Sequence, residues 1–264
     1  MNYRHIYHAG NFADIVKHLV LIALIEQLKK KEKPFAVLDG FAGVGIYDLN
    51  LEAAQKTSES LTGIKKLLSF TKSVTDLPNI LQIFLNLVKT FRQDYYPGSP
   101  LIITKLLRPN DRLIACELHP ADYLSLKSLL SNTYEMDAYT AIKAFLPFKE
   151  KRGLIFLDPP FEVKNEFDRL FEAIKEIKSR ALNNCVLIWY PIKDRILIRD
   201  FYHKYKNIGF KETLIIEYEL LHSDKNMIKC GLMIINPPNI KDDIMQISGY
   251  LTMALNLKVT SNYL

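Results

Sequence analysis

The 264-residue chain is poor in cysteine and has no hydrophobic run long enough to cross a membrane. Its three cysteines are odd in number and widely spaced, so they offer neither a disulfide framework nor a Cys-x-x-Cys metal site. The longest apolar run near the N-terminus is residues 19–25, against the roughly 20 residues that a membrane span needs. This run also lies too far behind polar residues for a signal peptide. These absences predict a soluble protein of the reducing cytoplasm.

Positively charged residues are only slightly in excess of negatively charged ones. The chain has 35 Lys and Arg against 29 Asp and Glu, a formal net charge of +6 and a pI near 9.0. Such a balance permits a polyanionic partner without requiring one. Hydrophobic residues make up 48% of the sequence, which suffices for the core of one large α/β domain.

Short apolar runs that end in a polar residue alternate with helical patterns along the chain. Asn11 and Asp14 form a capping pair that predicts a helix from Asn11 to Pro34. The predicted strands are residues 35–39, 112–117, 153–158 and 184–191, and residues 166–180 carry a helical pattern. This alternation indicates a parallel sheet with crossover helices, closed by an antiparallel pair at 212–220 and 229–236.

One interval breaks the alternation. About seventy residues separate the first predicted strand from the second, where a strand-helix-strand unit needs about 30. Helical patterns at 62–70 and from Asp76 to Phe91 fill this interval. They predict a helical subdomain inserted at about residues 48–95 of a single domain that spans residues 1–264.

A glycine-rich loop follows the first predicted strand, in the sequence DGFAGVG at residues 39–45. Asp39 ends the strand, and Gly40, Gly43 and Gly45 let the backbone turn sharply and pass close to a ligand. The spacing differs from the G-x-G-x-x-G of dinucleotide enzymes. It resembles the first motif of methyltransferases that use S-adenosylmethionine (SAM). The alternative is a tight turn between a strand and a helix with no ligand.

Two further acidic residues follow predicted strands. Glu117 ends the second strand, where a carboxylate can accept hydrogen bonds from both ribose hydroxyls of an adenosyl group. Asp137 lies where a third strand is expected to end and can bond an adenine amino group. A strand cap at the surface is the alternative for Glu117, and the glycine loop makes that alternative less favoured.

The sequence LDPPF at residues 157–161 places Asp158 at the end of the fourth strand. Pro159 and Pro160 have fixed φ angles and no N–H, so the carbonyls beside them are rigid acceptors. A carboxylate and a carbonyl can together accept both hydrogens of adenine N6, while Phe161 offers a face on which an extruded base stacks. An ordinary proline turn is the alternative. The related sequence NPP at 236–238 lacks an aromatic residue, and Asn236 is therefore interpreted as structural.

Five separated motifs carry a narrower resemblance: YRHIYHAGNFADIVKH (3–18), YYPGSP (95–100), ELHP (117–120), LDPPF (157–161) and WYP (189–191). Together they resemble the RlmJ family of 23S ribosomal RNA adenine-N6 methyltransferases over nearly the whole chain. The resemblance implies an α/β, Rossmann-like class I methyltransferase fold with an inserted helical subdomain, and SAM as cofactor. It also implies a monomer that methylates 23S rRNA, protein-free or in an early assembly intermediate, without a membrane partner.

The same resemblance implies roles for particular residues. Asp158 matches the catalytic aspartate, with Pro159 and Phe161 beside it, and Tyr3 matches a residue that handles RNA, with Arg4 and His5 next to it. The expected cofactor-binding residues are His18, Asp39, Gly40, Phe41, Gly43, Gly45, Ser99, Glu117, Asp137 and Ala138. Three positions depart from the family pattern: Phe41 replaces a histidine, Ala138 a glycine and Phe161 a tyrosine.

Alternative functions remain open from the residues themselves. DNA adenine methylation uses the same tetrapeptide, and a catalytically inactive nucleic-acid-binding protein can share the fold. His5 and His8 lack accompanying cysteines or carboxylates, so no metal site is expected. The lysines between 29 and 33 are interpreted as a solvated helix end, with a direct RNA contact as the less favoured alternative. The preferred candidates for phosphate contacts are Arg4, Lys17, Lys193, Arg195 and Arg199.

Overall fold

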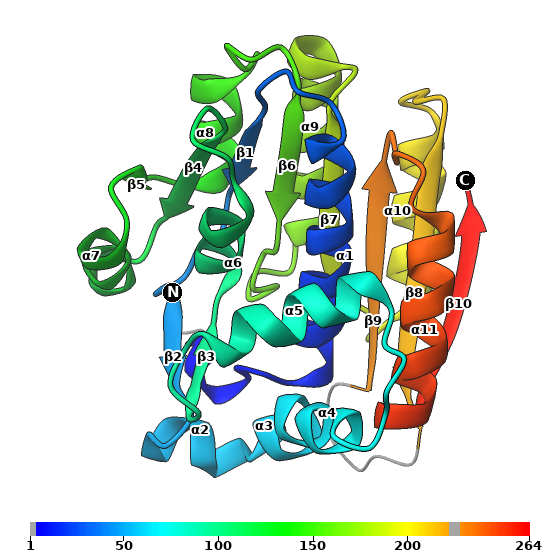
Figure 1. Cartoon of the computed structure of the whole chain (residues 1–264). Coiled ribbons are helices and arrows are strands. Elements are labelled where there is room, and N and C mark those ends of the chain that lie inside the picture. Colours follow the sequence, from blue (N-terminus) through cyan, green and yellow to red (C-terminus); the bar gives the residue numbers. More distant parts are fainter. Residues whose placement is uncertain (1–3, 222–227) are drawn as a thin grey trace.

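A computed structural model describes residues 4–221 and 228–264, which form one large sheet with helices on both faces (Figure 1). The eight strands lie in the order β10-β8-β9-β7-β6-β1-β4-β5. Their bounds are β1 (Ala36–Asp39), β4 (Arg112–Glu117), β5 (Thr133–Glu135), β6 (Gly153–Leu157), β7 (Cys185–Pro191), β8 (Thr213–Leu220), β9 (Lys229–Ile235) and β10 (Leu257–Tyr263).

The five strands from β5 to β7 run parallel, whereas β9 pairs antiparallel with both β7 and β8. Strand β1 lies between β4 on one side and β6 on the other, and the chain adds β4 and β5 on the first side before it adds β6 on the second. The direction in which strands are added to the sheet therefore reverses at β1. This is the doubly wound, Rossmann-like arrangement, in which ligands bind beyond the carboxyl ends of the strands at the reversal. The predicted fold class is confirmed.

Helices cover the sheet in two layers. One face carries α1 (Phe12–Lys29), α5 (Asn79–Lys89), α6 (Ser99–Leu106) and α11 (Lys241–Leu255), and the other α8 (Ala138–Phe145), α9 (Glu166–Ala181) and α10 (Arg195–Lys206). The remaining helices are η1 (His5–Tyr7), α2 (Glu52–Thr57), α3 (Glu59–Thr62), α4 (Ile64–Thr71) and α7 (Pro120–Leu129). Within the described residues, no helix has the length and apolarity that crossing a membrane requires.

Two hydrophobic cores result from the alternation of side chains along the strands. Val37 of β1 and Phe156 of β6 face the core beneath α1, while Leu38 and Ile155 face the core beneath α8 and α9. Both faces of the central strands are buried, which explains why their sequences are continuous apolar runs rather than alternating ones.

The first helix begins as predicted and ends earlier than predicted. The Asn11 side chain accepts a hydrogen bond from the backbone N–H of Asp14 at 2.9 Å, which caps α1. The predicted extension to Pro34 is wrong, because α1 ends at Lys29. Its last carbonyls are bonded by the arginine side chains of two distant loops, so the residues after Lys29 follow a bent path.

The interval between β1 and β4 contains α2, α3, α4 and α5, together with β2 (Ile46–Asp48) and β3 (Tyr95–Pro97). Strands β2 and β3 form a separate two-stranded sheet that the sequence did not indicate. Ile64 of α4 and Phe84 of α5 belong to the same core as α1. The division into one domain with an insertion at 48–95 stays a prediction.

Candidate active site

A cavity of about 940 Å³ opens where the carboxyl ends of β1, β4, β6 and β7 meet. The residues after these strands line it, together with α1, the N-terminal segment and the start of α2. Its volume lies in the range of nucleoside-sized ligand sites. The sheet therefore places a large pocket at the edge where doubly wound folds bind their ligands.

The glycine loop forms one wall of this cavity. Gly43 and Gly45 have φ angles of +62° and +85°, which favour glycine. A Cβ atom on Gly43 would lie 2.4 Å from the Tyr47 hydroxyl, so a larger residue would not fit. Gly40 has a different function, because a Cβ there would lie 2.9 Å from the Cβ of Ala138. Gly40 thus permits close packing of β1 against α8.

Glu117 is fixed by the loop backbone. One carboxylate oxygen accepts from the Gly43 N–H at 2.9 Å and the other from the His119 N–H at 2.7 Å. The side chain is buried, and burial raises the pKa of Glu117. Each carboxylate oxygen can still accept a second hydrogen bond, and the residue lines the cavity. The arrangement can therefore bind a pair of hydroxyl groups.

Three more polar residues cluster beneath the loop. Asp39 is fully buried, and burial raises its pKa to about 7, although the Ser99 hydroxyl acts in the opposite direction. His18 bonds the Tyr96 hydroxyl through Nδ1 at 2.8 Å and stacks on its ring. Burial lowers the pKa of His18 to about 3, so the imidazole is neutral near pH 7. His18 and Ser99 line the cavity, whereas Asp39 lies behind it.

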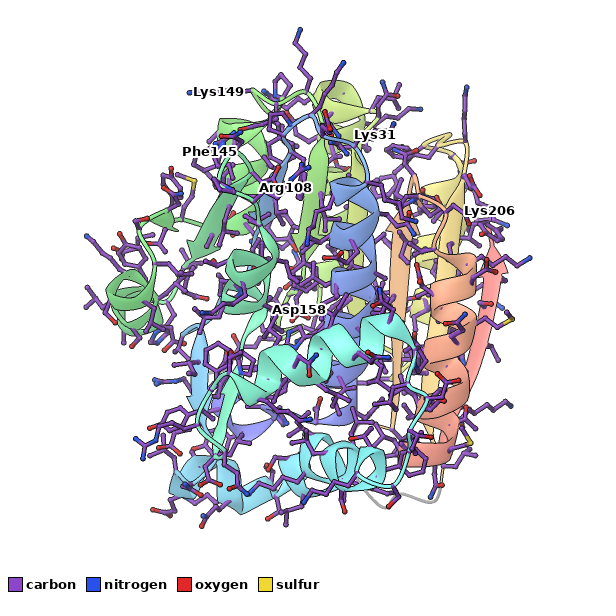
Figure 2. The ribbon with its side chains drawn as sticks, viewed as in Figure 1. Lys31, Arg108, Phe145, Lys149, Asp158 and Lys206 are labelled. Atoms are coloured by element: carbon purple, nitrogen blue, oxygen red, sulfur yellow. The ribbon has the colours of Figure 1, made fainter. Side chains whose placement is uncertain are left out.

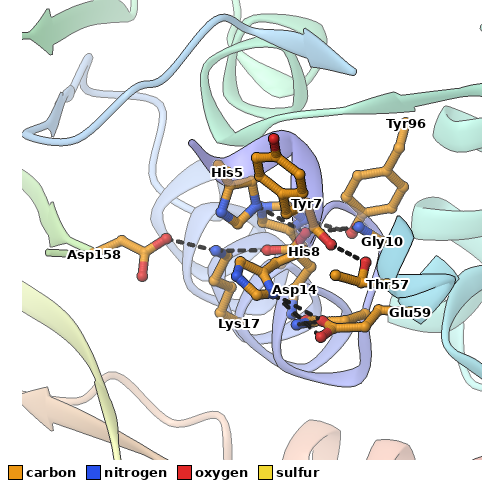
Figure 3. A network of polar contacts seen from close by, with 12 residues as sticks. His5, Tyr7, His8, Gly10, Asp14, Lys17, Thr57, Glu59, Tyr96 and Asp158 are labelled. Carbon is orange, nitrogen blue, oxygen red and sulfur yellow. Dashed lines mark hydrogen bonds and ion pairs between the residues drawn. The ribbon is translucent and has the colours of Figure 1, made fainter. Parts of the chain in front are cut away.

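The Asp158 carboxylate is held by a buried lysine (Figure 3). Lys17 Nζ donates to Asp158 Oδ2 at 2.5 Å and lies 2.6 Å from Asp14 Oδ1. Burial acts to lower the pKa of Lys17, but the two carboxylates outweigh burial and raise it. The ammonium therefore stays charged between two acids. Since Lys17 neutralises one of them, the three residues keep a net charge of −1 beside the cavity.

The residues after Asp158 have an uncommon backbone conformation. Phe161 has a φ of +51°, which is rare for an aromatic residue. Residues with such uncommon backbone angles are found most often at functional sites. Its ring packs edge-on against Phe167 at 5.0 Å and Trp189 at 6.1 Å. Asp158, Pro159 and Phe161 all line the cavity. The proline loop thus presents a carboxylate and an aromatic ring to one space.

The N-terminal segment covers part of the cavity. His5 bonds Asp14 Oδ2 through Nε2 at 3.0 Å, and Arg4 lies 3.6 Å from Asp122. His8 lies 3.2 Å from Glu59 of the inserted helices. Both Arg4 and His5 line the cavity, and their role toward a substrate stays a prediction, while Tyr3 lies outside the described residues.

Asp137 and Ala138 lie outside the cavity lining. Asp137 caps α8 by accepting from the N–H groups of Tyr139 and Thr140 at 3.1 and 3.0 Å, and it pairs with Arg169 at 3.0 Å. Most of its acceptor capacity is thus used within the chain. Of the expected cofactor-binding residues, the cavity brings together His18, Phe41, Gly43, Ser99 and Glu117.

Four of the five expected phosphate-binding residues have carboxylate partners, since Arg4 lies near Asp122 and Arg199 near Asp200, and Lys17 and Arg195 are also paired. Lys17 is 5% exposed and holds Asp158, so its interpretation as a surface phosphate contact is wrong. Arg195 pairs with Glu217 at 2.7 Å. Lys193 is exposed and lines the cavity, which keeps it a candidate. The role of Asp14 was missed, since its sequence position indicated only a helix start.

The NPP sequence lies at the opposite edge of the sheet, because β9 runs antiparallel to β7. The Asn236 side chain donates to the carbonyls of Leu182 at 2.7 Å and Asn184 at 3.0 Å. It therefore fixes the loop before β7 rather than facing a ligand. Its interpretation as structural is confirmed.

Strand order, glycine loop and cavity together define a class I methyltransferase fold. A profile of the family described as "Ribosomal RNA large subunit methyltransferase D, RlmJ" matches residues 32–263. The chain belongs to this family of ribosomal RNA large-subunit methyltransferases.

Individual relatives agree with this assignment. The chain is 40% identical to the ribosomal RNA large subunit methyltransferase J of Escherichia coli, over 90% of this chain and 88% of that protein. The protein of the same name from Haemophilus influenzae is 37% identical, over 97% and 94%. A crystal structure from Legionella pneumophila superposes with a TM-score of 0.88 at 34% identity, over 97% of this chain and 98% of that one.

Proposed function

We propose that this chain transfers a methyl group from SAM to N6 of an adenine in 23S ribosomal RNA. The observation that carries the proposal is the convergence of the glycine loop, Glu117 and Asp158 on one cavity of about 940 Å³. The family and the names of its relatives support ribosomal RNA as the substrate. SAM and the N6 atom are inferred from the chemistry of the side chains.

The residues of the cavity fit SAM. Gly43 lets the backbone approach a ligand without a side chain, and Ser99 and His18 offer polar groups beside it. Glu117 keeps acceptor capacity for the two ribose hydroxyls, because its backbone partners use one position on each oxygen. When bound, SAM would supply the methyl group as an electrophilic carbon on a sulfonium.

Asp158 and Pro159 orient the target amine. Lys17 occupies Asp158 Oδ2, which leaves Oδ1 free to accept one N6 hydrogen. The Pro159 carbonyl accepts the other hydrogen. Held in this way, the nitrogen becomes more pyramidal and its lone pair is directed at the methyl carbon. The net charge of −1 on Asp14, Lys17 and Asp158 would stabilise the positive charge that develops on N6 as the N–C bond forms and the C–S bond to the sulfonium breaks to leave a neutral thioether. One N6 proton would pass to solvent.

Phe161 stacks on the extruded base. Phe161 lines the cavity, and its ring is held by edge-on contacts with Phe167 and Trp189. Stacking on an aromatic face offsets part of the cost of removing a base from its neighbours. Phe161 lacks a hydroxyl, so it orients the base by its face alone. Tyr3, Arg4 and His5 are proposed to contact the RNA around that base.

The reaction is proposed to occur in the cytoplasm, with a monomer acting on protein-free 23S rRNA or an early assembly intermediate. Incubation with SAM labelled in the methyl group tests the substrate. Label should enter a protein-free 23S rRNA transcript and should stay absent from adenine-containing duplex DNA and from a buffer blank. Label in DNA alone would contradict the proposal, and label in neither would indicate an inactive binding protein.

A further inference from the structure

Five exposed lysines gather at the edge of the sheet opposite the cavity. Lys30, Lys31 and Lys33 precede β1, while Lys149 and Lys151 precede β6, and we call these five residues the lysine edge. Figure 2 shows Lys31 and Lys149 at one end of the molecule, away from Asp158. The sequence separates the two groups by more than a hundred residues, so only the fold brings them together.

Arg152 ties the two lysine-bearing loops to each other, and Arg108, from the loop before β4, holds the first of them. Arg152, next to Lys151, donates to the carbonyls of Leu28 at 2.7 Å and of Lys33. Arg108 donates to the carbonyls of Lys31 at 3.1 Å and Lys33 at 3.3 Å. The backbone that carries the lysines is therefore fixed.

The arginines are themselves held in place. Both guanidinium groups pack on the buried ring of Phe35, at 5.5 Å for Arg108 and 5.7 Å for Arg152. This packing keeps the lysine-bearing loops in position whether or not a ligand is present.

The neighbouring carboxylates leave the lysines uncompensated. Asp111 pairs with Arg108, and Glu150 pairs with Arg112, each at 2.8 Å. In residues 4–221 and 228–264, none of the five ammonium groups has an ion-pair partner within 4.0 Å. The hydrogen bond to Asp111 is the main cause that raises the pKa of Arg108, and Glu32, between Lys31 and Lys33, adds a smaller contribution. The edge thus presents an excess of positive charge to solvent.

A solvated helix end does not account for this cluster. Stabilisation by a helix dipole falls off within the last turn. Helix α1 ends at Lys29 and α8 ends at Phe145, so Lys31, Lys33 and Lys149 lie beyond those turns. Rigidly grouped like charges repel one another, and a partner with closely spaced negative charges relieves that repulsion.

We infer that the lysine edge binds phosphates of the same RNA, in a part of the molecule distant from the target base. The inference rests on the proposed function, which makes RNA the substrate. Six residue steps along β6 lead from Arg152 to Asp158, a length of roughly 20 Å at about 3.3 Å per residue. An RNA that binds at both places therefore extends over about that distance from the target base.

The test compares two triple charge reversals of equal net charge. Lys31→Glu, Lys33→Glu and Lys149→Glu alter the edge. The control variant carries Lys72→Glu, Lys89→Glu and Lys258→Glu, which are exposed lysines outside the edge, two of them at helix ends. Affinity for a protein-free 23S rRNA transcript is measured from 50 to 300 mM salt. SAM affinity by calorimetry serves as the check of folding.

The edge variant should bind the transcript at least about tenfold more weakly than the control variant near 150 mM salt. The slope of log affinity against log salt should be smaller in magnitude by about two to three for the edge variant. Each phosphate contact releases counterions when it forms, and this variant lacks three such contacts. Equal affinities and slopes in the two variants would overturn the inference. Edge-dependent binding to vesicles containing phosphatidylserine, with unchanged RNA binding, would overturn it in favour of a membrane surface.

The same variants separate this inference from the proposed reaction. Wild-type protein that binds the transcript but transfers no label would contradict the reaction, while the binding comparison would still decide the role of the edge. Normal labelling of RNA together with identical RNA binding by the two variants would support the proposed reaction and would contradict RNA binding by the lysine edge.

Discussion

Replacing Lys17 by methionine should abolish most methyl transfer and also destabilise the fold. The change keeps the unbranched apolar stem of the side chain but removes the ammonium that lies 2.5 Å from Asp158 Oδ2 and 2.6 Å from Asp14 Oδ1. The two effects come from different carboxylates, so they can be measured separately.

The loss of stability comes mainly from Asp14, whose side chain is 1% exposed. Breaking a buried ion pair by removing one partner costs about 3–5 kcal/mol. Asp14 would keep hydrogen bonds from the Gly10 N–H at 2.8 Å and from His5 at 3.0 Å. We therefore expect a decrease of about 3 kcal/mol in the free energy of unfolding, at the lower end of that range.

The loss of activity comes from Asp158. Without Lys17 the carboxylate loses the donor that fixes its orientation toward the cavity. Losing an oriented polar group costs roughly 100- to 1,000-fold in kcat, and SAM affinity should stay near the wild-type value because Glu117 and the glycine loop, not Lys17, are proposed to hold the cofactor. Single-turnover methylation, calorimetry with SAM and chemical denaturation measure the three quantities.

A double variant separates the two effects. Adding Asp14→Asn to Lys17→Met removes the uncompensated buried charge, so the two changes should be less destabilising together than their sum, by at least about 1 kcal/mol. Activity should remain low, because Asp158 still lacks its donor. A single variant with kcat within about threefold of wild type, or strictly additive stabilities, would refute this account.

Three further changes test the remaining parts of the site. Asp158→Ala should lower kcat by about 100- to 1,000-fold with SAM affinity unchanged, whereas Asp158→Asn, which keeps one acceptor oxygen, should retain more activity in the same assay if hydrogen-bond positioning dominates. Equal loss in both variants would instead assign the role to charge. Glu117→Ala should weaken SAM binding by about 1–3 kcal/mol in calorimetry, and unchanged affinity would remove Glu117 from the site. Burial raises the pKa of Asp39 to about 7. Its contribution to the free energy of unfolding is therefore fully present at a pH below the ordinary pKa of aspartate and is lost as the pH rises toward 7. Asp39→Asn removes this loss, and the variant should therefore become more stable relative to wild type between pH 4.5 and 7, by up to about 1.4 kcal/mol per pH unit. Denaturation curves of both proteins without SAM measure this difference, and a difference independent of pH would contradict the burial argument.

The sheet was predictable because its strands have strong local signals. Residues 113–116 and 154–157 are continuous apolar runs, and each is followed by an acidic residue, Glu117 or Asp158, at the active edge. Strand β10 gave no such signal. Of its residues only Leu257 is buried, because an edge strand with a solvated face needs few apolar side chains.

The partners of the site residues could not be predicted from local sequence. Lys17 and Asp158 are separated by 141 residues, and nothing near either position indicates the other. The sequence offered Lys17 as one basic residue among several, whereas the fold buries it. The positive φ of Phe161 is equally invisible, since aromatic residues rarely adopt it and no local pattern requires it.

The central claim is transfer of a methyl group to adenine N6 in 23S rRNA, and identifying the product nucleoside tests it most directly. A protein-free 23S rRNA transcript is incubated with SAM labelled in the methyl group, digested to nucleosides and separated by chromatography with mass detection. The account predicts that the label coelutes with N6-methyladenosine and disappears with the Asp158→Ala variant. Label in a methylated cytidine, guanosine or uridine, or an undiminished signal from that variant, would contradict it.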